Sequence, residues 1–358
     1  MSVDVYRSEQ RDPLRRGREI GWARRAQITR TARDYAWFFD AARVDDRTVR
    51  RVAEQCLDQL RDWAPPLAAE IEGIASGAGL DVWQAAALNA RTEILVRGSI
   101  AGLNECSVAV WVPDGKPPRS FQTWDWVPWA ADATVLGLRS EAALDVVTCT
   151  ESGVVGKVGV NGAGVGVHFT LMCHTSDGSV PGVPVHAVAR QVLDSATDLD
   201  SAIAVVQSAP VAASASLTLL HWDGVRARGA TVEIAPAGSA VLAPDDDFLL
   251  HTNHFLDPAL AAGDRLAAID DDTLPRMTEL RRRKQGLAAD SLTARATEFT
   301  CHWEDGAPVC AHPRPDASET NRWETKMMFS LDLASPALVL HEGGPCGVTE
   351  AGWMVVAP

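Results

Sequence analysis

The first third of the chain has the hydrophobic periodicity of α-helices. Over residues 12–98, apolar side chains recur at spacings of three and four, and helix breakers are rare. The pattern predicts a helix over Leu14–Phe39 and another over Asp45–Trp63, after which Pro65-Pro66 breaks the run. Asp81 has the position of an N-cap for a further helix. We therefore expect a nearly all-helical segment before the first strand.

The pattern changes after Gly102 to short β-rich runs separated by glycine, proline and aspartate. Strands are predicted at Ser107–Val112, Ser120–Trp124, Leu144–Thr150, Val154–Val160, Val165–Leu171, Ser216–His221, Ala230–Ile234, Phe248–Thr252, Lys326–Leu331 and Ala337–His341. Helices between them are predicted at Val185–Ser195, Leu199–Gln207 and Pro258–Leu287. Strands, then helices, then strands again indicate an α+β protein.

Composition and charge narrow the class of protein. The chain has 358 residues, of which 46% are hydrophobic, enough for a substantial core. It carries 33 Lys and Arg against 47 Asp and Glu, and the net charge of −14 argues against a nucleic-acid partner. No apolar run is long enough to span a membrane, and the N-terminus lacks the apolar region of a signal peptide. We therefore expect a soluble, cytoplasmic protein with no membrane partner.

The cysteine pattern does not predict disulfides or a metal site. The seven cysteines are an odd number scattered singly along the chain, so most are expected to be buried thiols. Cys301-His302 and Cys310-Ala311-His312 contain ligand-type residues, but their spacing matches no zinc motif, and core or loop positions are the preferred interpretation. The glycine-rich segment 162–166 has no helix pattern after it and is not a dinucleotide motif. No metal and no cofactor are predicted.

Three segments carry the residue types of a catalytic site. Cys106 stands at the start of a predicted strand, although a single cysteine is more often a small buried residue. Asp125 lies between Trp124 and Trp126 at the end of the next strand, where a carboxylate is costly to bury without a partner. Residues 251–255, His-Thr-Asn-His-Phe, close a later strand with side chains that can hydrogen-bond.

In this order, the segments resemble the family of acyl-coenzyme A:6-aminopenicillanic acid acyltransferases, the C45 peptidase branch of the N-terminal-nucleophile hydrolases. The motifs that carry the resemblance are Glu105-Cys106-Ser107, Phe121-Gln122-Thr123-Trp124-Asp125-Trp126 and Thr252-Asn253-His254, supported by Asn89–Glu93, Gly159–Val167 and Gly343–Cys346. The resemblance implies a four-layer αββα N-terminal-nucleophile hydrolase fold. It also implies a helical segment 1–105 and a catalytic segment 106–358, packed as one domain. Self-cleavage between Glu105 and Cys106 would then leave a heterodimer of the two fragments.

The resemblance also implies residue roles. Cys106 would be the nucleophile and its freed α-amino group the base, because an α-amino group with a pKa of about 7.7 to 8.0 can take the thiol proton at neutral pH. Asp125 would orient the α-ammonium group, and the Asn253 amide would lie where an oxyanion forms. Ordinary structural roles remain alternatives: Asp125 could pair with an arginine, and Asn253 could bond strand-end backbone. Candidate binding residues are Trp124, Trp126, His168, Thr170 and His254.

Some positions depart from the family pattern. Thr123 stands where the family has asparagine, Phe121 where it has glycine, and His168-Phe169-Thr170 where relatives often have an asparagine-containing segment. These differences predict a substrate pocket unlike that of the penicillin enzyme. Arg322 is a candidate for the pocket arginine of related enzymes, although its polar surroundings favour a surface role.

Together these features predict a self-processing amidohydrolase that cleaves an N-acyl or aminoacyl amide through an acyl-enzyme on Cys106. The alternatives are an acyl-CoA-dependent N-acyltransferase and an uncleaved, non-catalytic relative that binds a ligand. The expected partner is a small-molecule amide or acyl substrate, with acyl-CoA as the partner under the second hypothesis. Oligomerisation beyond the two fragments is left open.

Overall fold

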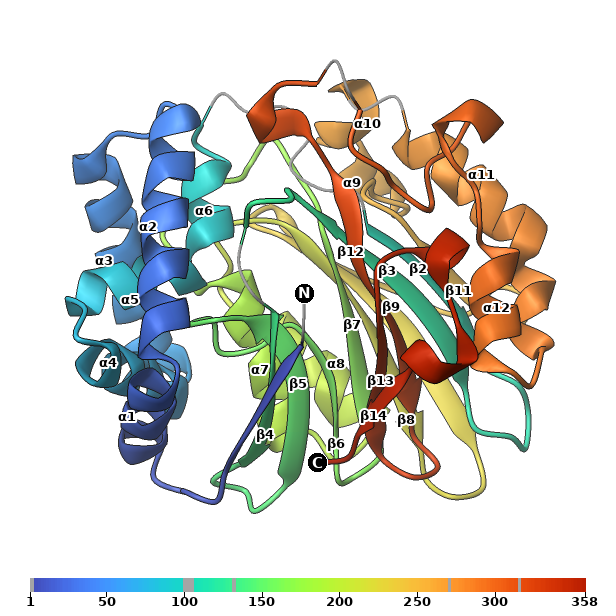
Figure 1. Ribbon diagram of the computed structural model, residues 1–358, viewed down its shortest axis with the longest axis horizontal. Coiled ribbons are helices and arrows are strands. Elements are labelled where there is room, and N and C mark those ends of the chain that lie inside the picture. The colour runs from blue at the N-terminus through green and yellow to red at the C-terminus, as the bar shows by residue number, and fades with distance from the viewer. Residues whose placement is uncertain (1–2, 99–105, 131–132, 270–271, 315–316) are drawn as a thin grey trace.

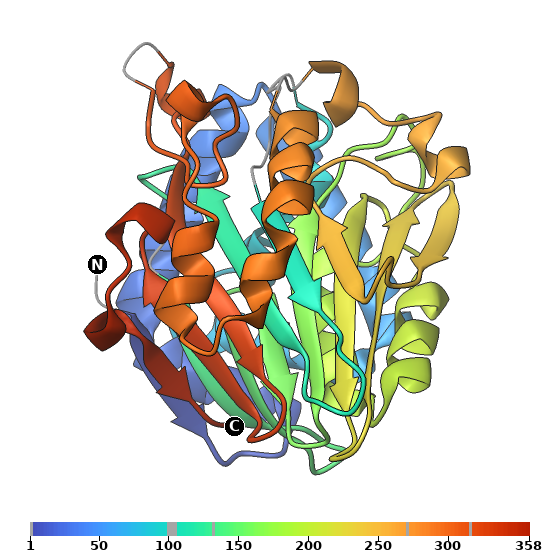
Figure 2. The same cartoon turned by 90° about the vertical axis from the view of Figure 1, so that its right-hand side faces the viewer.

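The computed structural model has four layers, in the order helices, sheet, sheet, helices (Figure 1). It describes residues 3–98, 106–130, 133–269, 272–314 and 317–358. The N-terminal helices form one outer layer. Helices α11 (Thr273–Arg283) and α12 (Leu292–Glu298) cover the opposite side and lie in front of the second sheet in Figure 2. The predicted α+β class and αββα layering are confirmed.

The first sheet has eight strands in the order β1-β4-β5-β6-β7-β8-β9-β10. Only the β1–β4 pair is parallel among these described strands. Their bounds are β1 (Asp4–Ser8), β4 (Ala133–Arg139), β5 (Asp145–Glu151), β6 (Val158–Asn161), β7 (Val165–Leu171), β8 (Ala215–Trp222), β9 (Ala227–Ala235) and β10 (Gly238–Leu242). Helices cover one face and the second sheet covers the other, so β7 is buried at every position.

The second sheet has six strands in the order β11-β2-β3-β12-β13-β14. Their bounds are β2 (Cys106–Trp111), β3 (Arg119–Trp126), β11 (Phe248–His251), β12 (Glu324–Asp332), β13 (Ala337–Glu342) and β14 (Met354–Val356). All its neighbouring pairs are antiparallel. Gln122 on β3 reaches across the interior and donates a hydrogen bond of 2.7 Å from Nε2 to the Phe169 carbonyl oxygen on β7. The two sheets therefore face each other across a buried interior that contains polar contacts.

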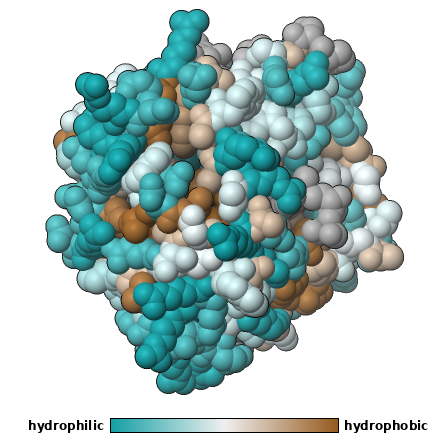
Figure 3. All heavy atoms as spheres, turned by 60° about the vertical axis from the view of Figure 1, so that its left-hand side comes forward, coloured by the Kyte–Doolittle hydropathy of each residue, from teal (hydrophilic) through white to brown (hydrophobic). Residues whose placement is uncertain are grey.

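The remaining helices lie before β2 or between the strands. Their bounds are α1 (Pro13–Ala23), α2 (Arg25–Ala41), α3 (Asp46–Trp63), α4 (Pro65–Ala78), α5 (Val82–Asn89), α6 (Arg91–Leu95), α7 (Val185–Ser195), α8 (Leu199–Ser208), α9 (Pro258–Ala261) and α10 (Leu266–Ile269). Figure 3 turns the N-terminal helical side forward; it is largely hydrophilic, with hydrophobic side chains across its middle. Among the described residues, no helix combines the length and apolarity needed to cross a membrane.

Several predicted elements differ in extent. The helix predicted over Leu14–Phe39 is two helices, α1 and α2, separated at Arg24. Pro65 begins α4, since a proline at the first helical position loses no hydrogen bond. The strand predicted over Val154–Val160 starts only at Val158. Before it, the Val155 N–H donates to Asn89 and the Val155 carbonyl oxygen accepts from Arg190. The backbone groups of Val155 therefore bond to side chains and not to a neighbouring strand.

Other differences are interruptions and omissions. The long helix predicted over Pro258–Leu287 is divided into α9, α10, α11 and a 3₁₀ segment at Lys284–Ala288. The first break falls where Thr175 N–H donates to the Gly263 carbonyl oxygen. Strands β1, β4, β10 and β14 were not predicted, because short or mixed segments show too little alternation.

Helices α1 and α4 pack with their backbones in direct contact. Gly17 and Gly21 lie on α1, and Gly73 and Gly77 lie opposite on α4. A Cβ atom added at Gly17 would lie 2.1 Å from a carbonyl oxygen of α4, and one added at Gly73 would lie 2.3 Å from a carbonyl oxygen of α1. Both distances are far inside van der Waals contact, so only glycine permits this approach.

A buried ion-pair cluster joins these helices to α7. Glu70 on α4 accepts a hydrogen bond of 2.8 Å from Arg16 Nε on α1 and one of 3.0 Å from Arg190 Nη1 on α7. Burial acts to raise the pKa of Glu70, but the two guanidinium groups hold it below its ordinary value. Because Arg190 follows residue 106, the cluster links both predicted fragments.

Candidate active site

Cys106 is held through both of its backbone groups. It is the first residue of β2 and is 2% exposed. Its N–H donates to Asn253 Oδ1 over 3.0 Å, and its carbonyl oxygen accepts from Arg276 Nη1 over 2.8 Å. Glu105, the other residue of the predicted cleavage site, lies outside the described residues. The backbone of Cys106 is thus fixed by side chains from the segment after β11 and from α11.

The Cys106 thiol has a buried cation nearby. Trp124 pairs directly opposite Cys106 in β3, and Lys157 Nζ lies 4.0 Å from the centroid of the Trp124 ring. Burial raises the pKa of the Cys106 thiol, while the Lys157 ammonium group and the Asp125 backbone N–H act to lower it. Burial lowers the pKa of Lys157 to about 8. At neutral pH the lysine is still largely protonated and favours the thiolate.

Asp125 is a fully buried carboxylate close to this centre. It accepts a hydrogen bond of 3.2 Å from the Thr123 hydroxyl at Oδ2, while Oδ1 has no hydrogen-bond partner among the described residues. Burial raises the pKa of Asp125 to about 7; the nearby Thr325 hydroxyl, the charge of Arg276 and the hydrogen bond from Thr123 act in the opposite direction. A carboxylate in this state can accept a further hydrogen bond, such as one from an ammonium group.

The Asn253 amide has partners at both ends. Its Oδ1 accepts from Cys106 N–H and, over 2.9 Å, from Arg276 Nη2, while its Nδ2 donates to the Leu171 carbonyl oxygen over 2.8 Å. Two donors on one side and a carbonyl on the other fix the orientation of the amide. The amide therefore presents its oxygen, not its nitrogen, to Cys106. This differs from the oxyanion-donor geometry that the resemblance implies.

Arg276 on α11 connects these groups and is fully buried. Besides its bonds to Cys106 and Asn253, its Nη1 donates to Ser107 Oγ over 3.2 Å and its Nε to Asp272 Oδ1 over 2.7 Å. Asp272 neutralises the guanidinium group within the same helix turn. A single arginine thus sets the positions of the cysteine backbone and of the asparagine amide.

A comparison of the sequence with known protein families identifies the family of this chain. The profile of the family described as "Acyl-coenzyme A:6-aminopenicillanic acid acyl-transferase" matches residues 114–298, more than half of the chain. The chain belongs to this family.

Three individual proteins of known name or structure share at most 30% of their aligned residues with this chain. The acyl-coenzyme A:6-aminopenicillanic-acid-acyltransferase 40 kDa form of Emericella nidulans is 30% identical over 190 residues, which cover 52% of this chain and 51% of the relative. The chain thus aligns with about half the length of that curated relative. Among solved structures, penicillin V acylase from Agrobacterium tumefaciens has a TM-score of 0.44 at 16% identity, covering 65% of this chain and 82% of that one. A mutant of the conjugated bile acid hydrolase from Clostridium perfringens has a TM-score of 0.43 at 10% identity, covering 70% and 97%.

The positions that depart from the family pattern have defined contacts. The Thr123 hydroxyl accepts from Ser107 N–H over 3.2 Å and donates to the Asp125 carboxylate. It therefore links β2, just after Cys106, to Asp125. The Phe121 ring stacks on Phe299 at 4.6 Å, away from the space between the sheets. His168 Nδ1 lies 2.7 Å from Gln122 Oε1, and burial lowers the pKa of His168 to about 3. This histidine is therefore neutral at physiological pH.

The other predicted binding residues lie around the centre with partners of their own. Trp126 donates from Nε1 to the Tyr35 hydroxyl over 3.1 Å and packs against the helical layer. Thr170 hydrogen-bonds Ser216 over 2.7 Å. His254 Nδ1 lies 3.0 Å from the Thr252 hydroxyl and anchors its own loop to the start of α11. Of the five candidates, only Trp124 directly opposes Cys106.

The supporting family motif Asn89–Glu93 attaches the helical segment to the first sheet. Asn89 Nδ2 donates to the Gly153 carbonyl oxygen over 3.0 Å, and Arg91 Nε donates to Glu151 Oε2 over 2.7 Å. Glu93 accepts from Val185 N–H over 2.8 Å, and burial raises its pKa to about 7. These residues hold α5 and α6 against segments that follow residue 106.

Sequence reasoning missed two site residues and named one that lies elsewhere. Arg276 and Lys157 were not predicted, whereas Arg322 was a candidate. Arg322 is exposed, and its Nε donates to the Ala317 carbonyl oxygen. The available signal for Lys157 was a single charge within the apolar run Val154–Val160. Arg276 lies on the same face of its helix as Met277 and Leu280, which are buried. This position on the apolar face was the sequence feature that could have identified Arg276 as a buried residue.

Proposed function

We propose that the chain cuts itself between Glu105 and Cys106 and then works as an N-terminal-cysteine amidohydrolase. The observation that carries the proposal is the Cys106 backbone, held by Asn253 on its nitrogen and by Arg276 on its carbonyl. In the cut, the Cys106 sulfur attacks the Glu105 carbonyl carbon, the thiol proton passes to the Cys106 nitrogen, and the C–N bond breaks. Water then hydrolyses the resulting thioester, leaving a carboxyl group on Glu105 and a free α-amino group on Cys106.

The freed α-amino group then serves as the base in each turnover. It takes the thiol proton, and the thiolate attacks the substrate amide carbon. Collapse of the tetrahedral species breaks the C–N bond, and the leaving amine takes the proton from the α-ammonium group. Water, deprotonated by the α-amino group, then attacks the acyl-enzyme, which releases the acid and restores the thiol. No metal or organic cofactor enters these steps.

We assign the surrounding residues to positioning and electrostatic roles. Asn253 Oδ1 holds the α-amino group, in place of the oxyanion role that the resemblance implied. Asp125 Oδ1 is the open acceptor for the α-ammonium group. Lys157 supplies positive charge to the thiolate. Trp124 forms an apolar wall beside the nucleophile.

The second nucleophile decides between two activities of the same acyl-enzyme. Water gives the amidohydrolase that we favour for an N-acyl or aminoacyl amide. An amine in place of water gives an acyltransferase, and the name of the Emericella nidulans relative favours this second candidate, with acyl-CoA as the acyl donor. Product analysis with one acyl donor, in the presence and absence of an amine, separates the two.

Intact-mass measurement under denaturing conditions tests the cut. For a chain of 38.4 kDa, cleavage after residue 105 should give fragments of roughly 11 and 27 kDa, with Cys106 at the start of the larger. A single full-length species from freshly purified protein would contradict self-processing and favour the uncleaved, ligand-binding alternative.

The two fragments are expected to stay together as a heterodimer. The Glu70 cluster and the Asn89–Glu93 motif join residues on both sides of the cut. Native mass measurement should therefore report the sum of the two fragment masses.

Replacing Lys157 by methionine should lower the reactivity of the Cys106 thiol. Loss of a neighbouring opposite charge raises a pKa by about 1 to 3 units, so the thiolate fraction near neutral pH should fall roughly tenfold or more. The measurement is the rate of iodoacetamide alkylation of Cys106 against pH in processed protein. In the unmodified protein, Lys157 is charged below about pH 8 and loses its effect above it.

Lys157→Arg is the matched control for charge. Arginine keeps its proton throughout this range, so the thiolate-promoting effect should persist above the point where lysine loses it. If Lys157→Met and the unmodified protein show the same alkylation profile, Lys157 has no electrostatic role at Cys106.

A further inference from the structure

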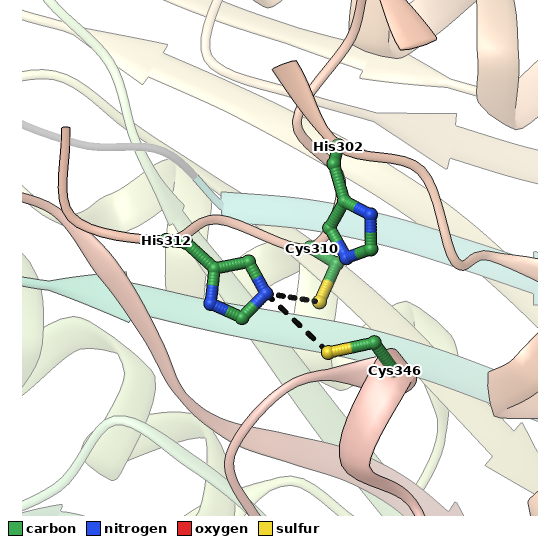
Figure 4. Close-up of side chains that lie close together, drawn as sticks. All are labelled: His302, Cys310, His312 and Cys346. Carbon is green, nitrogen blue, oxygen red and sulfur yellow. Dashed lines mark hydrogen bonds between the residues drawn. The ribbon is translucent and has the colours of Figure 1, made fainter. Parts of the chain in front are cut away.

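Four residues with nitrogen or sulfur ligand atoms gather at one end of the second sheet. His302, Cys310, His312 and Cys346 each offer a nitrogen or sulfur atom, and these four atoms all lie within 4.8 Å of one another. Figure 4 shows the His312 ring directed at both sulfur atoms and the His302 ring beside Cys310. The sequence interpretation rejected a zinc motif here because the spacing of Cys301-His302 and Cys310-Ala311-His312 matches none. It did not consider Cys346, which is 34 positions beyond His312.

Hydrogen bonds among the four residues cannot satisfy all of them. His312 Nε2 lies 3.7 Å from Cys310 Sγ and 3.3 Å from Cys346 Sγ, so one ring nitrogen faces both sulfur atoms. His302 Nε2 is buried and has no hydrogen-bond partner among the described residues. Its other ring nitrogen, Nδ1, lies 3.9 Å from Asp305 Oδ2.

We propose that these four residues bind one structural zinc ion. A tetrahedral zinc with bonds of about 2.3 Å to sulfur and 2.0 to 2.1 Å to nitrogen places its ligand atoms roughly 3.3 to 3.8 Å apart. The two sulfur–nitrogen separations of 3.7 and 3.3 Å fall in this range. Two sulfur and two nitrogen ligands in a tetrahedron are typical of zinc. Binding replaces the two thiol protons, which leave to solvent, by one divalent cation.

The position of the site gives the zinc ion a structural role. Its ligands come from three segments: the start of the 3₁₀ turn Trp303–Asp305, the stretch at 310–312, and the 3₁₀ turn Pro345–Gly347. Within the second segment, Ala311 exchanges hydrogen bonds with Thr325, which pairs with Asp125 across β12 and β3. Four protein ligands leave no open position for substrate. The zinc ion would therefore fasten the loop that lies against the Asp125 strand.

A solvent ion can reach the site. His312 and Cys346 are exposed, and with His302 they line a surface pocket. The inference does not depend on the proposed catalytic function, because none of these four residues has a role in it.

Metal analysis of the purified full-length protein tests the proposal. Protein grown with zinc and purified in reductant should retain about one zinc per chain after dialysis, as expected for a four-ligand structural site. After the zinc is removed, Co²⁺ should produce the visible absorption of a tetrahedral site and a sulfur-to-metal charge-transfer band. Removal of zinc by a chelator should lower the midpoint of thermal unfolding, because binding to the folded state is lost.

Single substitutions distinguish the site from adventitious binding. Cys346→Ser and His312→Gln change exposed side chains, so both variants should fold. Each should weaken metal binding by more than the roughly 10- to 100-fold cost of removing an outer-shell partner. Cys301→Ala is the matched control, because Cys301 is the buried neighbour of His302 and lies outside the cluster. The control should retain its zinc.

Three results would overturn the proposal. One is protein that retains no zinc and gives no tetrahedral cobalt spectrum. Another is equal loss of metal from Cys301→Ala and Cys346→Ser. The third is a Cys310–Cys346 disulfide in protein alkylated at lysis, which would show that the two sulfurs pair with each other instead of binding a metal.

Discussion

Replacing Cys106 by alanine is expected to leave the chain uncut and without amidase or acyltransferase activity. The substitution removes the sulfur that would attack both the Glu105 carbonyl and the substrate. Loss of a covalent nucleophile costs several orders of magnitude in rate, because the remaining groups cannot form the acyl-enzyme. Intact mass reports the first effect, and turnover of a panel of N-acyl and aminoacyl amides reports the second.

Cys149→Ala is a matched control for this experiment. Cys149 is also a buried thiol, on β5, and like Cys106 it lies near Lys157. The control should be processed and active. A Cys106→Ala protein that still appears as two fragments would sink the proposed mechanism, since cleavage would then have another agent.

Replacing Arg276 by methionine is expected to destabilise the folded chain strongly. Methionine keeps much of the length of the side chain but removes the hydrogen bonds that Arg276 donates to Cys106, Ser107 and Asn253. It also removes the cation beside the buried Asp272 carboxylate. Breaking a buried ion pair on one side costs about 3 to 5 kcal/mol, so the free energy of unfolding should fall by about that amount. Urea unfolding measures this loss when both chains compared also carry Cys106→Ala, which is expected to keep them uncut.

Arg282→Met provides the comparison on the same helix. Arg282 is exposed and pairs with Glu279, and a surface pair of this kind contributes about 0 to 1 kcal/mol. Equal destabilisation by the two substitutions would contradict the role given to Arg276. Since the charge of Arg276 acts to lower the pKa of Asp125, its loss should also move that pKa above about 7. Any pH-dependent step that needs the Asp125 carboxylate should then shift to higher pH.

The sequence predicted the fold well where the periodicity was regular. The amphipathic face of α3 and the buried run of β7 correspond closely to the predicted Asp45–Trp63 and Val165–Leu171. It failed where backbone groups bond to side chains, as at Val155, or where a strand depends on a distant partner, as β1 depends on β4. Such contacts join residues far apart in the chain and leave no local pattern.

The candidate site divides in the same way. Cys106, Asp125 and Asn253 were named from ordered motifs, and the structure brings all three to one end of β2 and β3. The orientation of the Asn253 amide could not be predicted, because it depends on Arg276 and on the Leu171 carbonyl. Arg276 stands among Arg281, Arg282 and Arg283 in the sequence, and only its helical face separates it from these exposed or half-buried residues.

The contact between α1 and α4 places an unexpected limit on how the N-terminal segment can vary. Here the helix axes approach so closely that alanine at Gly17, Gly21, Gly73 or Gly77 would push the backbones apart. Such a shift would also move Arg16 and Glu70, which adjoin the contact. A saturation screen over residues 1–105 should therefore find some of its least replaceable positions at glycines that carry no chemistry and lie far from the cut.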